Sequence, residues 1–300
     1  MPPFLFGNSI ILAENLVNIV GIIFAILKMI TKNCLGGNKM RRYFVIFFSL
    51  LLVVAIASGC GSKETSGSED SVLKSITTTK ILKVGTDATF PPFEFKNDKN
   101  EFDGFDIDLI REVAKVLGAD KVEFVDTEFK GLIPGLQAKH FDMVVSAMYI
   151  TDERKETIDF SDMYFPGGLT IMVDKDNESI KSIQDLYGKK VSVQIGTKSY
   201  KYLEENHPEV ELVAVEKNVE MFLELESKRV EAVVTGRPAA LVYAKESGKV
   251  KVLDHDLTQE EYGYGIRKEN QQLTEAVNQA IKTLRDNGTY DQIVQKWFGE

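Results

Sequence analysis

Residues 147–161 read A-M-Y-I-T-D-E-R-K-E-T-I-D-F-S. The apolar run Met143 to Ala147 leads into this stretch and predicts a buried strand. Thr151 is a good helix N-cap, and the two acidic residues after it suit the positive end of a helix dipole. Arg154 then lies on the first turn of a helix, beside the carboxyl end of a strand. An arginine there can grip a carboxylate with two parallel hydrogen bonds while backbone N–H groups assist.

The same arginine has a simpler interpretation. Arg154 could pair with Asp152, Asp159 or another surface carboxylate and have no ligand. The peptide taken alone does not decide between these two interpretations.

From Lys80 onward, predicted strands and helices alternate. A βαβ run of this kind predicts a parallel sheet with helices on both faces, and ligands bind such sheets outside the carboxyl ends of the strands. Pro91 and Pro92 exclude a helix, so 89–95 should be an extended loop at that edge. The expected strands are 81–85, 122–125, 143–147, 169–173, 190–195, 210–215, 232–235 and the extended stretch 261–266. The expected helices are 106–117, 132–138, 182–186, 197–205, 219–228, 238–246 and 271–286, followed by the segment 290–298.

Composition narrows the class of protein. The chain has 300 residues, of which 44% are hydrophobic, and a formal charge of -9, which indicates a globular protein. The acidic balance argues against nucleic acid as a partner, because a phosphate-binding surface needs clustered Lys and Arg. The three histidines, His140, His207 and His255, are scattered without ligand spacing, so we expect no metal site. The two cysteines are Cys34 and Cys60, so the chain after Cys60 folds without a disulfide.

The front of the chain reads as a targeting segment. Arg41-Arg42 precede fourteen mostly apolar residues, 43–56, and then Ala57-Ser58-Gly59-Cys60. This is the layout of a secretory signal, and the apolar run is shorter than the about 20 residues of a membrane span. The end of the segment resembles a lipobox, with Ala57 where leucine is usual. We therefore predict a lipoprotein signal peptide over 40–59 and lipidation of Cys60. The alternative is a buried cysteine at the end of an anchoring helix.

Two further stretches flank the predicted signal peptide. Residues 60–71 are polar and rich in Gly and Ser, which predicts a flexible tether. Residues 1–39 contain another apolar run, Leu16 to Leu27, before the signal begins. We interpret them as an upstream extension that is not translated, with Met40 as the true start, because 35–39 can be encoded by a purine-rich sequence like a ribosome-binding site. The alternative is an extra membrane-associated helix.

Several motifs together resemble a known family. They are G-T-D-A-T-F-P-P-F-E-F (85–95), G-F-D-I-D-L (104–109), G-L-I-P-G-L (131–136), I-T-D-E-R (150–154), I-D-F-S (158–161) and N-G-T-Y-D-Q-I-V-Q-K-W-F (287–298). In this order and spacing they resemble the family 3 solute-binding proteins, the extracellular receptors of polar amino-acid ABC importers. The resemblance covers about 73–299.

The resemblance implies an α/β, two-lobed, periplasmic-binding-protein-like fold of type II. Each lobe is a sheet flanked by helices, and two crossing strands form the hinge. Lobe 1 would comprise 72–165 plus 267–300, and lobe 2 would comprise 168–261. The hinges would lie near 164–168 and 262–266, where glycines would tolerate backbone rotation.

The resemblance also implies a ligand site. Arg154 matches the arginine that holds the ligand α-carboxylate, and Asp87 matches a position that often contacts the polar end of the ligand. Phe90 and Phe129 match positions that sandwich the ligand side chain, although packing between the lobes is the alternative for both. The remaining predicted ligand-binding residues are Ala147 and Tyr149 near the amino and carboxylate groups, Gln194, Thr197 and Lys198 in the turn that completes carboxylate binding, and Met148 and Gly236.

Two positions depart from the family pattern. Members that bind α-amino acids usually carry an acidic residue in lobe 2 for the ligand ammonium, and aligning T-G-R-P (235–238) puts Gly236 there. A buried ammonium without a carboxylate partner costs several kcal/mol. Tyr149 replaces a small or hydroxyl residue and could form an aromatic cage with Phe90 and Phe129. A local misalignment, with Glu231 or Asp87 serving the ammonium, is the alternative.

The leading hypothesis is a receptor without catalytic residues, cofactor or metal. It would capture an amino acid or similar small zwitterion and deliver it to the ABC permease, as a monomer held by lipid at the outer face of the membrane or in the periplasm. The alternative ligand class is a compatible solute, ectoine-like or betaine-like. A secreted dehydratase could use Asp87 or Glu94 as general acid, but neither lies in a catalytic motif that we recognise. A sensor domain would continue into a membrane helix, whereas this chain ends at Glu300.

Overall fold

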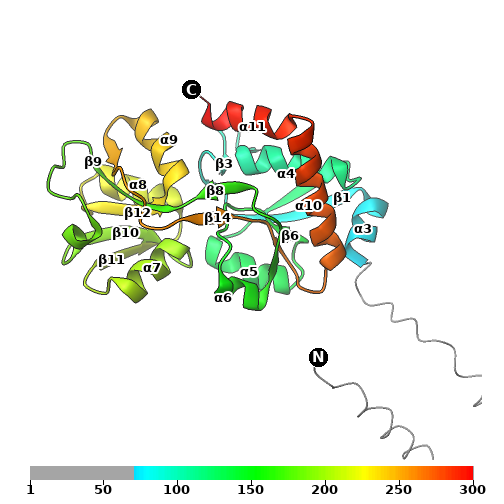
Figure 1. Cartoon of the computed structure of the whole chain (residues 1–300), viewed down its shortest axis with the longest axis horizontal. Coiled ribbons are helices and arrows are strands. Elements are labelled where there is room, and N and C mark those ends of the chain that lie inside the picture. Colours follow the sequence, from blue (N-terminus) through cyan, green and yellow to red (C-terminus); the bar gives the residue numbers. More distant parts are fainter. Residues whose placement is uncertain (1–70, 300) are drawn as a thin grey trace, which may run out of the picture. The chain divides into compact units, whose positions relative to one another are not determined.

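The computed structural model describes residues 71–299, and these form a two-lobed α/β fold (Figure 1). The predicted upstream extension, the signal peptide, Cys60 and the tether up to residue 70 lie outside the described residues. We call the part built on the first sheet lobe 1 and the part built on the second sheet lobe 2.

The sheet of lobe 1 has five strands. In spatial order they are β5 (Lys121–Asp126), β1 (Ile81–Thr86), β6 (Met143–Val144), β15 (Gly265–Ile266) and β7 (Asp159–Phe160). The helices of this lobe are α3 (Ser71–Thr79), α4 (Phe105–Val116), α5 (Phe129–Gln137), α6 (Asp152–Thr157), α10 (Gln271–Asp286) and α11 (Thr289–Phe298). A small antiparallel sheet of β2 (Thr89–Phe90), β3 (Glu94–Lys96) and β4 (Phe102–Asp103) lies where the sequence predicted only an extended loop.

The sheet of lobe 2 also has five strands. Their order is β11 (Glu211–Val215), β10 (Lys190–Gln194), β12 (Ala232–Gly236), β9 (Leu169–Asp174) and β13 (Val250–Val252). The helical elements are a 3₁₀ turn (Ile183–Leu186), α7 (Lys198–Asn206), α8 (Asn218–Glu226) and α9 (Arg237–Ser247). Strand β12 is buried along its whole length, and it carries Gly236 at its carboxyl end.

The expectation of parallel sheets is wrong for part of each sheet. Strand β1 runs parallel to β5 and β6, and β10 runs parallel to β11 and β12. Strand β15, however, is antiparallel to β6 and β7, and β9 is antiparallel to β12 and β13. Parallel neighbours need a crossover connection, usually a helix. Strands β9 and β15 follow directly on the crossings between the lobes, so they enter their sheets without such a helix.

The lobes are joined by a two-stranded antiparallel sheet. Strand β8 (Phe165–Gly167) pairs with β14 (Glu260–Tyr262), with Tyr262 opposite Phe165. The first crossing therefore falls within the predicted 164–168. The paired part of the second crossing, 260–262, overlaps the predicted 262–266 only at Tyr262, and Gly265 and Ile266 already belong to the sheet of lobe 1. In Figure 1 both connections run side by side through the middle of the molecule.

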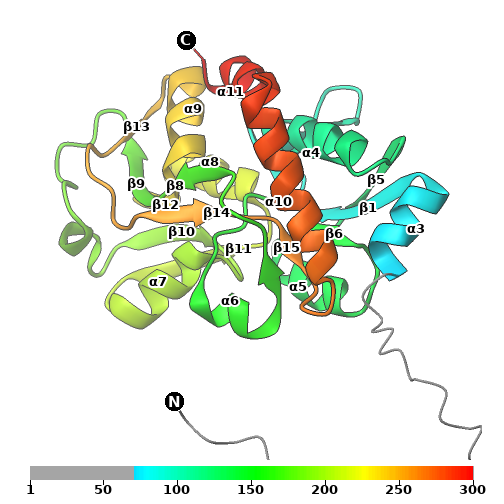
Figure 2. The same ribbon diagram turned by 45° about the vertical axis from the view of Figure 1, so that its right-hand side comes forward.

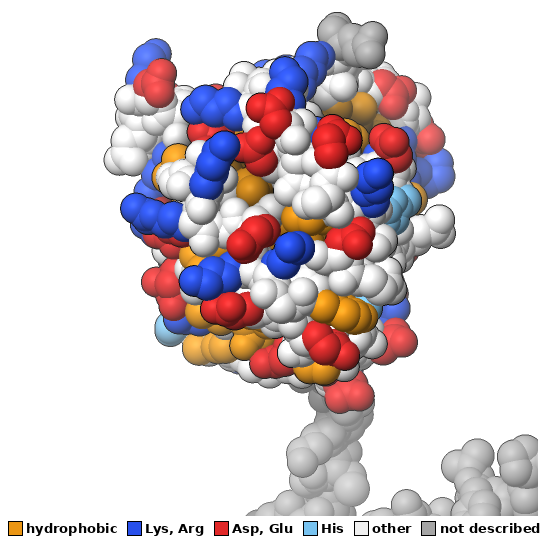
Figure 3. Space-filling model, turned by 90° about the vertical axis from the view of Figure 1, so that its left-hand side faces the viewer, with side chains coloured by type: hydrophobic (Ala, Val, Ile, Leu, Met, Phe, Trp, Pro, Cys, Tyr) orange, Lys and Arg blue, Asp and Glu red, His pale blue; other side chains and the backbone are white. Residues whose placement is uncertain are grey.

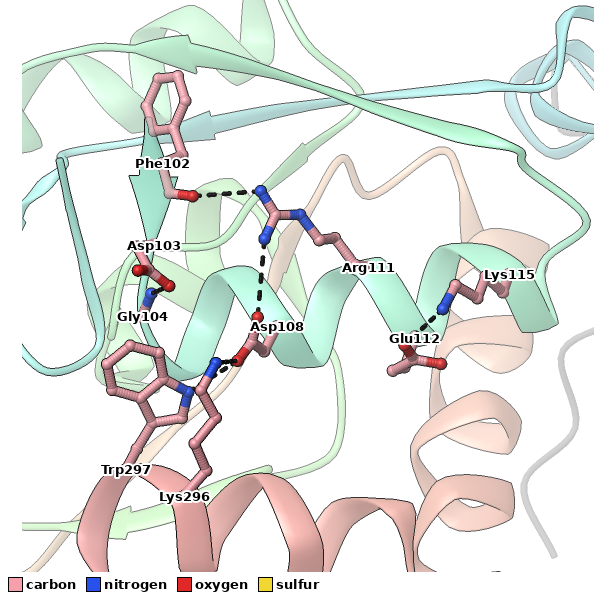
Figure 4. A network of polar contacts seen from close by, with 9 residues as sticks. All are labelled: Phe102, Asp103, Gly104, Asp108, Arg111, Glu112, Lys115, Lys296 and Trp297. Atoms are coloured by element: carbon pink, nitrogen blue, oxygen red, sulfur yellow. Dashed lines mark hydrogen bonds and ion pairs between the residues drawn. The ribbon is translucent and has the colours of Figure 1, made fainter. Parts of the chain in front are cut away.

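The C-terminal helices pack onto lobe 1. Helix α10 buries one apolar face that includes Leu273, Val277 and Ile281, as its amphipathic pattern predicted. It contacts α3, α4 and α11 (Figure 2). On α4, the Asp108 carboxylate accepts hydrogen bonds from Lys296 Nζ at 2.6 Å and Trp297 Nε1 at 2.9 Å (Figure 4). These contacts fix the end of α11 against α4.

The outer face of lobe 2 carries charges of both signs without a patch of either sign (Figure 3). In Figure 3 acidic and basic side chains are interspersed over this face, so charge alone does not mark a docking surface there.

Within residues 71–299, no helix combines the length and apolar character that crossing a membrane requires.

Candidate functional site

A small cavity lies between the two lobes. It encloses ≈ 40 Å³, whereas one water molecule needs roughly 10–15 Å³ on this measure. The arrangement is therefore closed, and a larger ligand enters only if the lobes separate. The lining residues from lobe 1 are Phe90, Glu94, Phe129, Ser146, Ala147, Tyr149 and Arg154; those from lobe 2 are Leu169, Gln194, Thr197, Lys198, Ser199, Asn218, Thr235 and Gly236, with Tyr262 from the crossing strand.

Arg154 lies at this cavity on the first turn of α6. Thr151 caps the helix as predicted, and its Oγ1 accepts a hydrogen bond from Arg154 N–H at 3.2 Å. The guanidinium donates to the carbonyl of Tyr149 at 2.8 Å and to the carbonyl of Gly196, in lobe 2, at 3.2 Å. Within residues 71–299 no carboxylate oxygen lies within 4.0 Å of it, so the simpler interpretation as a surface ion pair is wrong there. Burial lowers the pKa of Arg154 to about 10.

The predicted aromatic positions divide between two roles. The Phe129 ring lies under the Arg154 guanidinium, 5.3 Å from its centroid. Phe90 stacks on Phe93 at 5.7 Å and is 7% exposed. The Tyr149 ring stacks on Tyr262 at 4.3 Å, so one of its faces is already covered. An aromatic cage of Phe90, Phe129 and Tyr149 would have only the other face of Tyr149 to offer a ligand.

Tyr149 and Tyr262 form an uncharged wall against Gly236. The Tyr262 hydroxyl donates to the Tyr149 hydroxyl at 2.9 Å, which in turn donates to the carbonyl of Gly168 at 3.1 Å. A Cβ atom on Gly236 would lie 2.5 Å from the Tyr262 hydroxyl and 3.0 Å from that of Tyr149. A side chain at position 236 is therefore incompatible with these two tyrosines as they stand.

Lobe 2 contributes the turn between β10 and α7. Thr197 caps α7: its Oγ1 accepts from Tyr200 N–H and donates to the carbonyl of Gln194. Lys198 is the first residue of the helix, and its Nζ lies 3.6 Å from Glu260 Oε1. The Gln194 amide reaches across to lobe 1 and donates to Asp87. The turn thus brings a cation and backbone N–H groups to the cavity.

Three carboxyl groups are buried beside the cavity in lobe 1. Asp106 accepts from Ala147 N–H and from the Tyr164 hydroxyl, each at 2.8 Å. This holds Ala147 at a φ of 37°, an unusual backbone conformation for a residue with a side chain. The Ser146 hydroxyl donates to Glu94 at 2.9 Å and accepts from Asp87 N–H at 3.0 Å. Burial raises the pKa of Asp87 to about 6 and that of Asp106 to about 7, and it raises that of Glu94 well above its usual range.

The structure brings together most of the predicted site residues, but not all. Asp87 does not line the cavity; it lies beneath, bonded to Gln194 and Thr89. The Met148 side chain is 1% exposed and packs in a hydrophobic cluster with Leu132 and Ile158, away from the cavity. We therefore do not carry Met148 into the proposed site.

Sequence reasoning missed six lining residues: Ser146, Leu169, Ser199, Asn218, Thr235 and Tyr262. Glu94 was considered only as a general acid of a dehydratase and not as a ligand-binding residue, although a glutamate inside the apolar run P-P-F-E-F is rarely buried without a partner. Among the described residues, no group of three or more His, Cys, Asp or Glu side chains is placed to hold a metal.

Residues 82–300 match the bacterial extracellular solute-binding proteins, family 3. The chain belongs to this family. It is 32% identical over 253 residues to the L-cystine-binding protein TcyJ of Escherichia coli (strain K12), covering 84% of this chain and 95% of TcyJ. The structure of an ancestral arginine-binding protein bound to arginine superposes with a TM-score of 0.70 at 46% identity, covering 73% of this chain and 99% of that one.

A further solved relative bears on the enzyme question. The ancestral amino acid-binding protein AncCDT-1, a precursor of cyclohexadienyl dehydratase, superposes with a TM-score of 0.72 at 45% identity, covering 76% of this chain and 100% of that one. The solved relatives of this chain within family 3 thus include an arginine-binding protein and an amino acid-binding protein. Beside Gly236, the hydroxyls of Tyr262 and Tyr149 occupy the space that a side chain would need.

Proposed function

We propose that this protein is the extracellular receptor of an ABC importer for an amino acid or a similar small carboxylate-bearing zwitterion. The observation that carries the proposal is Arg154: its guanidinium lines the cavity between the lobes, and its described partners are backbone carbonyls rather than a carboxylate. A ligand carboxylate would supply the missing counter-charge through charge-assisted hydrogen bonds. Solute binding by relatives of the family supports the same reading.

The other lining residues would complete the site. Lys198, Thr197 and the N-terminus of α7 add positive potential for the carboxylate from lobe 2. Phe90 and Phe129 offer apolar surface to the ligand side chain, while Ala147 and Tyr149 line the cavity beside Arg154. Gln194 connects this turn to Asp87.

Binding would be coupled to closure of the lobes. Arg154 and Phe129 come from lobe 1, whereas Thr197 and Lys198 come from lobe 2, so only the closed form offers both halves of the site. A ligand shifts an equilibrium only through its different affinity for the two states. Closure would thus follow from contacts made on both sides at once, and the closed surface would then dock on the permease.

The enzyme alternative has one observation in its favour. Glu94 lines the cavity, and burial raises its pKa, a shift in the direction that suits a general acid. We infer a receptor rather than an enzyme because AncCDT-1, the relative connected with a dehydratase, is itself described as an amino acid-binding protein. Recovering a bound ligand chemically unchanged after long incubation would support the receptor; recovering a dehydrated product would favour the enzyme.

We also propose that the mature protein is a monomer anchored outside the cell through lipid on Cys60, with residues 1–39 untranslated. Mass spectrometry of the precursor and of the mature N-terminus tests both parts. A peptide from 1–39 would contradict the translation start at Met40, and an unmodified cysteine would contradict the lipid anchor.

A ligand screen by thermal unfolding tests the receptor function. The full-length protein, stripped of ligand by unfolding and refolding, is melted with each L-amino acid, with betaines and ectoine, and with amino-free carboxylates. A ligand at 100 times its Kd adds about 2.7 kcal/mol to the free energy of unfolding. We expect at least one carboxylate-bearing compound to raise Tm by several degrees. A panel in which none does so would overturn the proposal, and a shift with betaines or ectoine alone would favour the compatible-solute class.

A further inference from the structure

The positively and the negatively charged side chains that line the cavity belong to different parts of the fold. Arg154 and Lys198 are the cations, and they belong to the α6 and α7 turns, which meet through the bond from Arg154 to the carbonyl of Gly196. Among the described lining residues, Glu94 is the only carboxylate. It belongs to β3, under the Ser146 hydroxyl. A zwitterion in this cavity would therefore find its two counter-charges on different elements.

Among the described residues that line the cavity, no acidic side chain belongs to the wall next to Arg154. That wall consists of Tyr149, whose backbone carbonyl already binds Arg154, with Tyr262 stacked on it and Gly236 opposite. The two hydroxyls bond to each other and to backbone. A Cβ atom at Gly236 would meet them at 2.5 and 3.0 Å, so the space that a side chain of residue 236 would need is filled. An ammonium group directly beside the ligand carboxylate would have no carboxylate partner among the described lining residues, and the nearby Glu260, outside the lining, already lies 3.6 Å from Lys198 Nζ.

Glu94, in contrast to that uncharged wall, offers the cavity an acidic group. It is 1% exposed, and its Oε1 accepts the Ser146 hydroxyl. Its Oε2 is buried and has no hydrogen-bond partner among the described residues. Such an oxygen is costly unless something binds it. Because Glu94 lines the cavity, a cationic group of the ligand would supply that partner, and it would also offset the charge of the neighbouring Asp106, whose Oδ1 is likewise buried without a partner among the described residues.

We propose that the ligand is a zwitterion whose cationic group lies far from its carboxylate. The carboxylate binds Arg154, and a distal ammonium or guanidinium group binds Glu94. The wall of Tyr149, Tyr262 and Gly236 offers no counter-charge to an α-ammonium group, so that group adds little to the affinity. This rests on the proposed function, since it names the ligand class for the same cavity. The matching chemistry is an ω-amino or ω-guanidino carboxylic acid. An α-amino acid would bind through its side-chain cation, with its α-ammonium contributing little.

A ligand panel on the unaltered full-length protein tests this without any variant. The probes are 6-aminohexanoate, L-lysine, L-norleucine and hexanoate, with 5-guanidinopentanoate and L-arginine as a second matched set, measured by calorimetry. We expect 6-aminohexanoate or 5-guanidinopentanoate to bind within about 3-fold of its α-amino counterpart. L-norleucine should bind at least about 10-fold more weakly than L-lysine, because it lacks the distal ammonium and so loses the free energy of a hydrogen bond to a charged group.

The variant Glu94→Gln then tests whether Glu94 is the residue that binds the distal cation. It keeps the size of the side chain, and it should weaken the distal-cation ligands by about 10- to 100-fold while changing hexanoate binding by less than about 2-fold. Circular dichroism checks that the variant folds; if it does not, the panel on the unaltered protein still decides. L-norleucine binding as tightly as L-lysine would overturn the inference, as would an equal loss for hexanoate in Glu94→Gln. If no carboxylate binds at all, the proposed function fails instead.

Discussion

The side-chain amide of Gln194, at the end of β10 in lobe 2, donates a 2.5 Å hydrogen bond to the carboxylate of Asp87, which follows β1 in lobe 1. Both residues are buried, at 1% and 3% exposure. A second bond crosses the cleft nearby, from Asn218 N–H to Thr89 Oγ1 at 3.2 Å. These are contacts of the protein with itself, so they stabilise the closed arrangement independently of any ligand.

Gln194→Ala should therefore favour separation of the lobes in the ligand-free protein. The variant leaves the buried Asp87 carboxylate without its partner from the other lobe, and such losses cost about 1–3 kcal/mol. We expect a larger radius of gyration by small-angle X-ray scattering without ligand. Lys130→Met is the control: it removes another cross-lobe contact, to Glu216 at 2.6 Å, but an exposed one, which contributes little. Equal effects of the two changes would contradict the special role of the buried bond.

Arg154→Gln should weaken ligand binding by about 100-fold or more, given the strength of a charge-assisted bidentate pair. The measurement is the loss of the ligand-induced rise in Tm, with Kd from calorimetry. Lys155→Gln is the matched control, because Lys155 is the next residue of the same helix, is exposed and lies 3.9 Å from Asp152. An affinity that survives Arg154→Gln would show that the carboxylate binds elsewhere.

Elements that depend on local sequence were predicted well. The cap by Thr151 is confirmed by the bond to Arg154 N–H, and α10 has the predicted bounds 271–286. Helix α7 begins at Lys198, one residue after the predicted start at Thr197, which is its N-cap. Caps and amphipathic faces follow from residues within a few positions of one another, which is why a single sequence suffices for them.

The polar interior of the site could not be predicted in the same way. Asp106 and Ala147 are 41 residues apart, and Gln194 and Asp87 are 107 apart. Nothing in either local sequence indicates such a partner. Strand β6 is also shorter than the predicted 143–147, since it ends at Val144, and Ala147 has a φ of 37°. The left-handed backbone there depends on a carboxylate from α4.

The buried acids make stability depend on pH. Burial raises the pKa of Asp87 from 3.8 to about 6 and that of Asp106 from 3.8 to about 7. The folded protein therefore binds more protons than the unfolded chain between about pH 4 and pH 7, so the free energy of unfolding falls as pH rises through this range. We expect a higher Tm at pH 5 than at pH 7.5, measured on the ligand-free protein.

Asp106→Asn should reduce that pH dependence. Its amide oxygen can still accept from Ala147 N–H and the Tyr164 hydroxyl, while the titrating group is lost. Each pKa unit corresponds to about 1.4 kcal/mol, and a protein of this size changes Tm by about 2–4 °C per kcal/mol. Asp98→Asn removes an exposed carboxylate and controls for net charge. A slope of Tm against pH that is the same in Asp106→Asn and in the unaltered protein would show that Asp106 does not contribute.

Asp108→Asn should destabilise lobe 1 by loosening α11. The carboxylate accepts from Trp297 Nε1 and Lys296 Nζ and lies 3.6 Å from Arg111, so three groups lose one charged partner (Figure 4). Because the site is partly exposed, we expect a loss of about 1 kcal/mol, or about 2–4 °C in Tm. The single tryptophan, Trp297, reports the local change by fluorescence. Glu112→Gln, which removes the exposed pair with Lys115 one turn along α4, should change Tm by less than about 2 °C. A comparable loss in both variants would mean that α11 is held by apolar packing rather than by Asp108.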